Sequence, residues 1–274
     1  MTERLPRVLV FDSGVGGLSV ARCIHQYRPD AELVYLADNV MFPYGDLAES
    51  VVVERCCRLI AQAQEEAPCD VIVVACNTAS TVALPALRAQ TDVPVVGVVP
   101  AVKPAAACSE NRRIGVLATP ATVKRPYLDE LVQTFAADCQ VIRLGLPELV
   151  RWAEQRVAGT TPPQDEMDRV LAPLRQARVD TVVLGCTHYP LLLPWLQVAL
   201  PEVKHWVDSG PAIARRVDEL LARAGFVAAA DRTTAKLGAV IKLHFTGIEP
   251  ANLGGFMTDL GLRRDLRTIA ANNL

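Results

Sequence analysis

Two short runs of branched apolar residues, each followed by a cysteine, constrain the fold most strongly. The first is VIVVAC at residues 71–76 and the second is TVVLGC at residues 181–186. Such runs predict strands buried on both faces, as in parallel sheets covered by helices. Each cysteine would lie at the carboxyl end of its strand, where open α/β sheets bind ligands. A single buried cysteine is ordinary core filling. Two at matching places suggest a shared function.

In the first part of the chain, strands alternate with helices. The strands are expected at residues 7–11, 32–37, 71–74 and 93–99, and the helices at residues 18–27, 47–66 and 81–90. This alternation is typical of a doubly wound parallel sheet. Because right-handed crossovers bring parallel strand ends to one edge, we expect Asp12, Asp38 and Cys76 to lie near one another.

The pattern starts again near residue 100. Strands are expected at residues 113–118, 140–144 and 181–184, and helices at residues 126–137, 147–157 and 165–176. Cys186 follows Cys76 by 110 residues, and Thr119 follows Asp12 by 107 residues. Thr119 and Thr122 come after the end of a predicted strand, as Asp12 does. We therefore predict an α/β fold with two similar doubly wound parallel-sheet domains facing across a cleft. One would comprise residues 1–98 and 208–274 and carry Cys76, and the other residues 99–207 and carry Cys186.

The end of the chain has no cysteine repeat of its own, so we expect it to return to the first domain. DSG at residues 208–210 repeats residues 12–14, and a helix should follow at residues 211–224, capped by Gly225. We expect a loop at residues 226–235, an edge strand at residues 240–245 and at most frayed helix beyond.

Composition excludes several classes of function. With 28 basic and 30 acidic residues, the net charge is −2, which gives no electrostatic footprint for nucleic acid or an anionic membrane. No apolar run reaches transmembrane length, and no signal peptide precedes the first strand. The eight cysteines include no Cys-x-x-Cys pair, which argues against a zinc site and favours free thiols in a reducing cytoplasm.

Two thiols on opposite sides of a substrate suit inversion of a stereocentre, because a proton leaves one face and another arrives on the opposite face. The pKa of a cysteine is easily lowered by its neighbours, so thiols can act as such bases. Asp12 and Asp38 are candidate proton partners for Cys76, and His188 for Cys186. The structural alternatives are that the aspartates cap helices and that His188 is a hydrogen-bonded core residue.

Small polar residues begin the helix after each cysteine, and a helix amino end favours carboxylates or phosphates. They are Asn77, Thr78, Ser80 and Thr187, of which the two threonines and the serine could instead be simple helix caps. The glycine-rich loop at residues 14–17 lacks both the G-x-G-x-x-G pattern and a P-loop lysine, so nucleotide binding is a minor alternative. No lysine follows a strand end convincingly, which argues against pyridoxal phosphate and for chemistry without a cofactor.

Four segments together resemble the sequence signatures of bacterial glutamate racemases, within the Asp/Glu racemase superfamily. They are FDSGVGGLSV at residues 11–20, FPYG at residues 42–45, ACNTAS at residues 75–80 and LGCTHYP at residues 184–190. They occur in the family's order, and the resemblance extends from about residue 7 to about residue 222.

The resemblance implies a cofactor-independent, cytoplasmic enzyme that interconverts L- and D-glutamate, a small-molecule substrate, and supplies D-glutamate for peptidoglycan. The charge balance predicts no nucleic-acid or membrane partner, and the resemblance implies a homodimer. Cys76 resembles the base for D-glutamate and Cys186 the base for L-glutamate, assisted by Asp12 and His188. The residues matching the family's substrate-binding pairs are Asp12, Ser13, Tyr44, Gly45, Asn77, Thr78, Thr187 and His188, with Asp38, Thr119 and Thr122 as further candidates.

Two departures from the family pattern leave questions open. Many members carry a functional glutamate after the fifth strand, and here both Glu148 and Glu154 are available. The stretch after Gly225 matches little of the family.

Three other functions compete with glutamate racemisation. An aspartate racemase would keep both cysteines around a different pocket, whereas a decarboxylase or isomerase relative could manage with fewer. A non-catalytic two-lobed amino-acid-binding protein would leave both cysteines as core filling.

Overall fold

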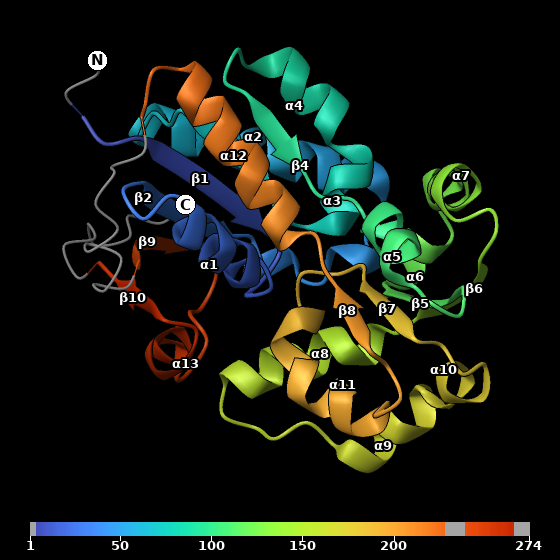
Figure 1. The fold of residues 1–274 in the computed structure, drawn as a ribbon. Coiled ribbons are helices and arrows are strands. Elements are labelled where there is room, and N and C mark those ends of the chain that lie inside the picture. Colours follow the sequence, from blue (N-terminus) through green and yellow to red (C-terminus); the bar gives the residue numbers. More distant parts are fainter. Residues whose placement is uncertain (1–3, 228–238, 266–274) are drawn as a thin grey trace. The chain divides into compact units, whose positions relative to one another are not determined.

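A computed structural model of the chain describes residues 4–227 and 239–265, which divide into two compact units. Unit 1 comprises Met1–Val98 and Gly210–Leu274, and unit 2 comprises Val99–Ser209. Each unit is built on its own parallel sheet with helices (Figure 1). The predicted fold class, α/β with two parallel sheets, is confirmed.

Unit 1 contains a six-stranded sheet in the order β10-β9-β2-β1-β3-β4. Its elements are β1 (Arg7–Asp12), α1 (Leu18–Tyr27), β2 (Glu32–Ala37), the 3₁₀ turns η1 (Asn39–Met41) and η2 (Tyr44–Asp46), α2 (Glu49–Glu66), β3 (Val71–Val74), α3 (Asn77–Val82), α4 (Leu84–Gln90), β4 (Val95–Gly97), α12 (Gly210–Arg223), β9 (Ala239–Phe245), α13 (Leu253–Asp259) and β10 (Leu262–Arg264).

Alternate side chains of the unit 1 strands point to opposite faces of the sheet. Leu9 and Phe11 of β1 pack with the apolar faces of α2, α3 and α4 in one core cluster. The helices α1 and α12 pack against each other (Figure 1), and both contact strands of the same sheet. Because β1 and β3 are covered on both faces, their residues from Val8 to Phe11 and from Val71 to Val74 are almost wholly buried.

Unit 2 contains a four-stranded sheet in the order β6-β5-β7-β8. Its elements are α5 (Val102–Cys108), β5 (Arg113–Ala118), α6 (Pro120–Val123), α7 (Pro126–Phe135), β6 (Gln140–Gly145), α8 (Pro147–Val157), α9 (Gln164–Val170), α10 (Ala172–Gln176), β7 (Thr181–Leu184), η3 (Tyr189–Leu192), α11 (Leu193–Ala199) and β8 (His205–Val207). The helices α5 and α7 pack on one face in a single core cluster, and α8 to α11 gather on the other side (Figure 1).

The four strands of unit 2 repeat the order of four strands in unit 1. The sequence β6-β5-β7-β8 corresponds to β2-β1-β3-β4, strand for strand along the chain. In register, Val8 of β1 pairs with Val71 of β3, and Ile114 of β5 pairs with Thr181 of β7. The repeat inferred from residue spacing is therefore a repeat of sheet topology.

Two predicted helices are each broken into two pieces. The helix expected at residues 81–90 begins earlier, at Asn77, and divides into α3 and α4, while the helix expected at residues 165–176 divides into α9 and α10. Pro85 and Pro173 lie in the first turn of α4 and α10. Proline lacks the N–H that would continue the preceding helix, so a new helix starts at each of them.

The elements β9, α13 and β10 belong to unit 1, and the prediction that residues 240–245 form an edge strand is wrong. β9 pairs with β2 on one side and with β10 on the other, so it is an interior strand and β10 is the edge. Gly225 has φ +89° after α12, which confirms the expected cap. Most of the loop expected at residues 226–235, and residues 266–274, lie outside the described residues.

No helix within residues 4–227 and 239–265 is long and apolar enough to cross a membrane.

The interior position of β9 predicts a large effect of truncating its core side chain. Ile241 is fully buried and pairs with Leu33 and Arg264 on the flanking strands. We expect Ile241→Ala to lower the free energy of unfolding by about 2–5 kcal/mol, because it leaves a cavity. Ile248→Ala is the matched control, since Ile248 is 91% exposed. Chemical denaturation of both variants checks this, and equal unfolding midpoints would contradict an interior β9.

Candidate functional site

The first cysteine, Cys76, is held directly after β3 by an extension of the sheet. The amide of Ala75 donates to the carbonyl of Phe11 at 2.7 Å, so pairing with β1 continues past the end of the strand. The helix α3 begins at Asn77. Cys76 therefore occupies the turn from strand to helix at the carboxyl edge of the unit 1 sheet, and is 6% exposed.

Asp12 is connected to Cys76 through Ser13. The Ser13 hydroxyl donates to Asp12 Oδ1 at 3.3 Å and lies 3.8 Å from Cys76 Sγ. The amide of Gly14 donates to the same Asp12 oxygen at 3.2 Å. The N-cap position of α1 is occupied by Gly17 and not by Asp12. Asp12, which is fully buried, instead orients the serine beside the thiol.

Asp38 was expected beside Cys76, and its backbone lies at that edge, with its amide bonded to the carbonyl of Asp12 at 2.9 Å. Its buried side chain neither caps η1 nor makes its main contacts with the thiol. It accepts hydrogen bonds from the hydroxyls of Tyr44 at 2.7 Å and Thr246 at 2.8 Å, and from Arg55 Nε at 2.8 Å. A second Arg55 nitrogen bonds its other oxygen.

The contacts around Asp38 fix its charge state. Burial alone raises the pKa of the Asp38 carboxyl, but hydrogen bonds from Arg55, Tyr44 and Thr246 outweigh this, and the pKa is lowered. The pKa of Tyr44 is raised, first by burial and then by electrostatic interactions with Cys56, Asp38 and Cys76 and by the hydrogen bond to Asp38. Asp38 is thus a buried carboxylate, and Tyr44 remains a hydroxyl donor.

Further predicted polar residues of unit 1 surround Cys76 or follow it. Asn77 and Thr78 form the first turn of α3 and are buried, and Gly45 lies in η2 beside Tyr44. Within the described residues, Asn77 Oδ1 is a buried acceptor with no hydrogen-bond donor. Ser80 bonds the carbonyl of Val74 at 2.9 Å and so serves the backbone.

The second cysteine, Cys186, is placed in unit 2 by the same device. The amide of Gly185 donates to the carbonyl of Leu117 at 2.7 Å, which extends the pairing of β7 with β5. A Cβ atom on Gly185 would come within 2.9 Å of that carbonyl oxygen, so the close approach requires glycine. Cys186 is 6% exposed, like Cys76.

Cys186 has a different partner from Cys76. The Nδ1 atom of His188 lies 3.8 Å from Cys186 Sγ, and its Nε2 atom lies 2.8 Å from Glu154 Oε1. Burial lowers the pKa of His188, but the hydrogen bonds with Cys186 and Glu154 outweigh it, and the pKa is raised well above its ordinary value. His188 therefore carries a proton between a thiol and a carboxylate.

The two glutamates that the sequence left undecided have different surroundings. Glu154 of α8 contacts His188, whereas Glu148, at the start of the same helix, forms an exposed ion pair with Arg151 at 4.0 Å. α8 packs against η3, which directly follows His188, and this packing brings Glu154 to the imidazole.

The three predicted threonines of unit 2 are buried. Thr119 accepts a hydrogen bond from the amide of Thr122 at 3.3 Å and caps α6. The two hydroxyls lie 3.0 Å apart. Thr187 lies between Cys186 and His188 in the chain.

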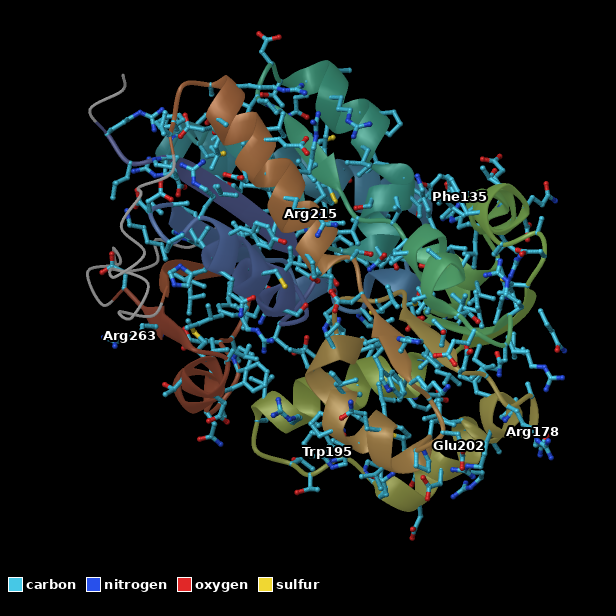
Figure 2. The ribbon with its side chains drawn as sticks, viewed as in Figure 1. Phe135, Arg178, Trp195, Glu202, Arg215 and Arg263 are labelled. Atoms are coloured by element: carbon cyan, nitrogen blue, oxygen red, sulfur yellow. The ribbon has the colours of Figure 1, made fainter. Side chains whose placement is uncertain are left out.

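Other parts of the molecule offer weaker sites. Among the residues described, no group of three His, Cys, Asp or Glu side chains could hold a metal ion. A hollow of about 730 Å³ in unit 2 is lined by residues that include Arg178 and Glu202 (Figure 2). The lining of this hollow also includes Asp180 and Lys204, which directly precede β7 and β8. This is the amino edge of the sheet, opposite the edge where parallel sheets bind ligands.

Sequence reasoning missed two contacts in the site. Arg55 gave no signal, because an arginine in the middle of a long amphipathic helix reads as a solvated residue. Thr246 lies in a segment without a family match. Both were found only from the packing of distant segments around Asp38.

Comparisons with known proteins identify the family of the chain. The family model for Asp/Glu/Hydantoin racemase matches residues 18–217. Over 214 residues the chain is 50% identical to the glutamate racemase of Shewanella loihica, covering 78% of this chain and 80% of that protein. Over 222 residues it is 53% identical to the glutamate racemase of Salmonella typhimurium, covering 80% of this chain and 78% of that protein.

Solved structures extend the similarity to most of the fold. The crystal structure of Escherichia coli glutamate racemase, in complex with L-glutamate and the activator UDP-MurNAc-ala, has a TM-score of 0.84 at 45% identity, with 95% of this chain and 97% of that chain covered. Glutamate racemase isoform RacE1 from Bacillus anthracis has a TM-score of 0.78 at 27% identity, with 97% of each chain covered. The chain therefore belongs to the Asp/Glu/Hydantoin racemase family, and its two parallel sheets with a thiol at a strand end in each are consistent with these matches.

Proposed function

We propose that this protein is a glutamate racemase that interconverts L- and D-glutamate, without a cofactor, and supplies D-glutamate for peptidoglycan. The observation that carries the proposal is a buried thiol at the same place in each unit, directly after the third strand of the repeat. Each thiol lies 3.8 Å from a side chain that is bonded to a carboxylate. Relatives about 50% identical are named glutamate racemases, which supports glutamate as the substrate.

The proposed reaction is a proton exchange at Cα. One sulfur, as thiolate, takes the α-proton, and the other, as thiol, gives a proton to the opposite face. The C–H bond that breaks is replaced by a new one of inverted configuration, and no electrons are gained or lost. Cys76 acts as the base on D-glutamate and Cys186 as the base on L-glutamate, and the roles reverse with direction.

The two thiols are assisted differently in this proposal. Ser13, oriented by Asp12, lies within hydrogen-bonding reach of Cys76. His188, held protonated by Glu154, exchanges a proton with Cys186. Glu154 rather than Glu148 therefore takes the place of the functional glutamate found in many family members.

The substrate-binding residues are proposed from the same neighbourhoods. The buried Asn77 Oδ1, which no described residue supplies with a donor, suits the ammonium group of an amino acid. Ser13, Tyr44, Gly45, Thr78, Thr187 and His188 complete the proposed binding set, with Thr119 and Thr122 more distant candidates because their hydroxyls serve α6.

A cytoplasmic location and a homodimer belong to the same proposal. All eight cysteines are free, which fits a reducing compartment. Sedimentation of the purified protein tests the dimer.

The purified protein should racemise glutamate with no added cofactor. We expect the circular dichroism of L-glutamate to decay towards zero, and deuterium from heavy water to enter Cα. A constant signal with glutamate while aspartate or a hydantoin turns over would assign the protein to another activity of its family. Tight binding of glutamate with no Cα exchange would favour the binding-protein alternative.

Replacing either thiol should abolish most racemisation. A positioned proton-transfer group contributes roughly 10²–10⁴-fold to rate. We therefore expect Cys76→Ser and Cys186→Ser each to lower kcat by about 100-fold or more. Each variant keeps one base, so Cys76→Ser should exchange the α-proton of L-glutamate faster than that of D-glutamate, and Cys186→Ser the reverse.

Cys57→Ser is the matched control for these variants, because Cys57 lies on α2 and is only partly buried. It should keep normal kinetics. Full racemase activity in both Cys76→Ser and Cys186→Ser would refute the two-thiol mechanism.

Removing the charge of Glu154 should change the pH dependence of the reaction. The raised pKa of His188 means that its ion pair stabilises the folded state fully below about pH 6.5, the ordinary histidine value, and loses this effect as pH rises through the raised pKa. Glu154→Gln should move the alkaline limb of kcat/KM for L-glutamate down by about 1–3 pH units. The fall in Tm as pH rises through the raised pKa of His188 should also be smaller in Glu154→Gln than in the unmodified protein.

Glu148→Gln provides the comparison, as the same change on the same helix outside the His188 contact. Its pH–rate profile should match that of the unmodified protein. Identical profiles for Glu154→Gln and Glu148→Gln would remove Glu154 from the mechanism.

A further inference from the structure

We propose that Thr246, from the chain segment after β9, is a positioning residue that holds the Tyr44–Gly45 turn in its substrate-binding arrangement through Asp38. The proposal rests on the proposed function, in which this turn contacts glutamate. Thr246 lies beyond residues 18–217, the part of the chain that the family model matches, and its hydroxyl contacts Asp38 and the turn η1.

The contact begins with the Thr246 hydroxyl, which bonds in two directions. It donates to Asp38 Oδ1 at 2.8 Å and accepts from the amide of Val40 at 3.3 Å. The backbone amide of Thr246 also donates to the carbonyl of Ala37 at 3.0 Å, which continues the pairing of β9 with β2. The sheet therefore fixes the position of Thr246, and Thr246 fixes the residues that follow β2.

The next residues strengthen the same junction. The amide of Gly247 donates to Asn39 Oδ1 at 2.7 Å, and Asn39 Nδ2 donates to the carbonyl of Ile248 at 2.7 Å. A Cβ atom on Gly247 would come within 2.8 Å of Val40 Cγ2, so the two segments run very close together.

Apolar burial contributes little to this junction. Val40 is 58% exposed and Ile248 is 91% exposed, although both flank the contact. Hydrogen bonds therefore hold η1 against the segment after β9, and removal of a hydroxyl should loosen it more than a similar change in the core would.

Asp38 connects this junction to the turn that carries Tyr44, because its carboxylate accepts a hydrogen bond from the Tyr44 hydroxyl. Its carboxylate is fully buried and receives Thr246 and Arg55 on one oxygen, and Tyr44 and Arg55 on the other. Tyr44 is itself 1% exposed and packs with Cys76 in one core cluster. A carboxylate so fully bonded has one stable orientation, and that orientation sets the position of the Tyr44 hydroxyl.

The expected consequence is on substrate binding rather than on proton transfer. If the turn is loosened, only a fraction of the molecules hold it in the binding arrangement before glutamate arrives. The apparent Kd for glutamate then rises, because it equals the intrinsic Kd divided by that fraction. The thiols remain in place, because neither Cys76 nor Cys186 contacts Thr246 in the hydrogen bonds described. Loss of uniform binding raises KM and leaves kcat unchanged.

The test compares Thr246→Val, which removes the hydroxyl at similar volume, with Thr246→Ser, which keeps it. We expect Thr246→Val to raise KM for glutamate about five- to tenfold, with kcat within about twofold of normal. Thr246→Ser should have the KM of the unmodified protein, because it keeps the hydroxyl. Thr258→Val is the matched control, since the Thr258 hydroxyl bonds only the carbonyl of Gly254 in its own helix among the hydrogen bonds described.

A second measurement does not depend on activity. Hydrogen–deuterium exchange followed by mass spectrometry should show faster exchange of residues 39–47 in Thr246→Val, and no change there in Thr258→Val. Normal KM and normal exchange in Thr246→Val would overturn the positioning role. A lowered Tm with unchanged KM would also overturn it, by making Thr246 merely structural. If the unmodified protein fails to racemise glutamate, the proposed function fails, while the exchange measurement still decides whether Thr246 orders the turn.

Discussion

The parallel pairing of β3 with β1, and of β7 with β5, is the constraint on which the candidate site depends. In each unit, one backbone hydrogen bond extends the pairing past the apolar strand, from Ala75 to Phe11 and from Gly185 to Leu117. The backbone of the cysteine that follows is fixed in position, because the strand before it is buried on both faces and a helix or turn starts directly after it. Side chains that follow the neighbouring strands, such as Asp12 and Asp38, reach the same edge for the same reason.

The features that sequence could predict are those carried by local pattern. Four consecutive apolar residues in β3, and three after a threonine in β7, indicated doubly covered strands. The spacing of 110 residues between the cysteines indicated the repeat that appears in the order of the two sheets. The same reasoning could not separate Glu154 from Glu148. Glu154 lies four residues after the buried Val150, and Glu148 lies four residues before the buried Trp152, so both border the apolar stripe of α8.

The features that sequence could not predict depend on partners distant along the chain. β9 alternates only partly and so resembled an edge strand, yet pairing with Leu262–Arg264 makes it interior. Those three residues carry two arginines and give no strand signal of their own. In the same way, nothing local to Arg55 or Thr246 indicates Asp38, which lies 17 residues away in one case and 208 in the other. Only the assembled sheet brings these residues together.

The two units keep the same strand order but differ in the group beside each thiol, and this difference has a chemical consequence. In unit 1 the carboxylate of Asp12 acts on a serine hydroxyl, which does not titrate near neutral pH. In unit 2 the carboxylate of Glu154 acts on an imidazole, a titratable group whose pKa is raised well above its ordinary value. The protonation of His188, adjusted by Glu154, therefore gives the Cys186 side a pH sensitivity that the serine beside Cys76 does not provide. A repeated fold thus supports two chemically unlike environments, one beside each thiol.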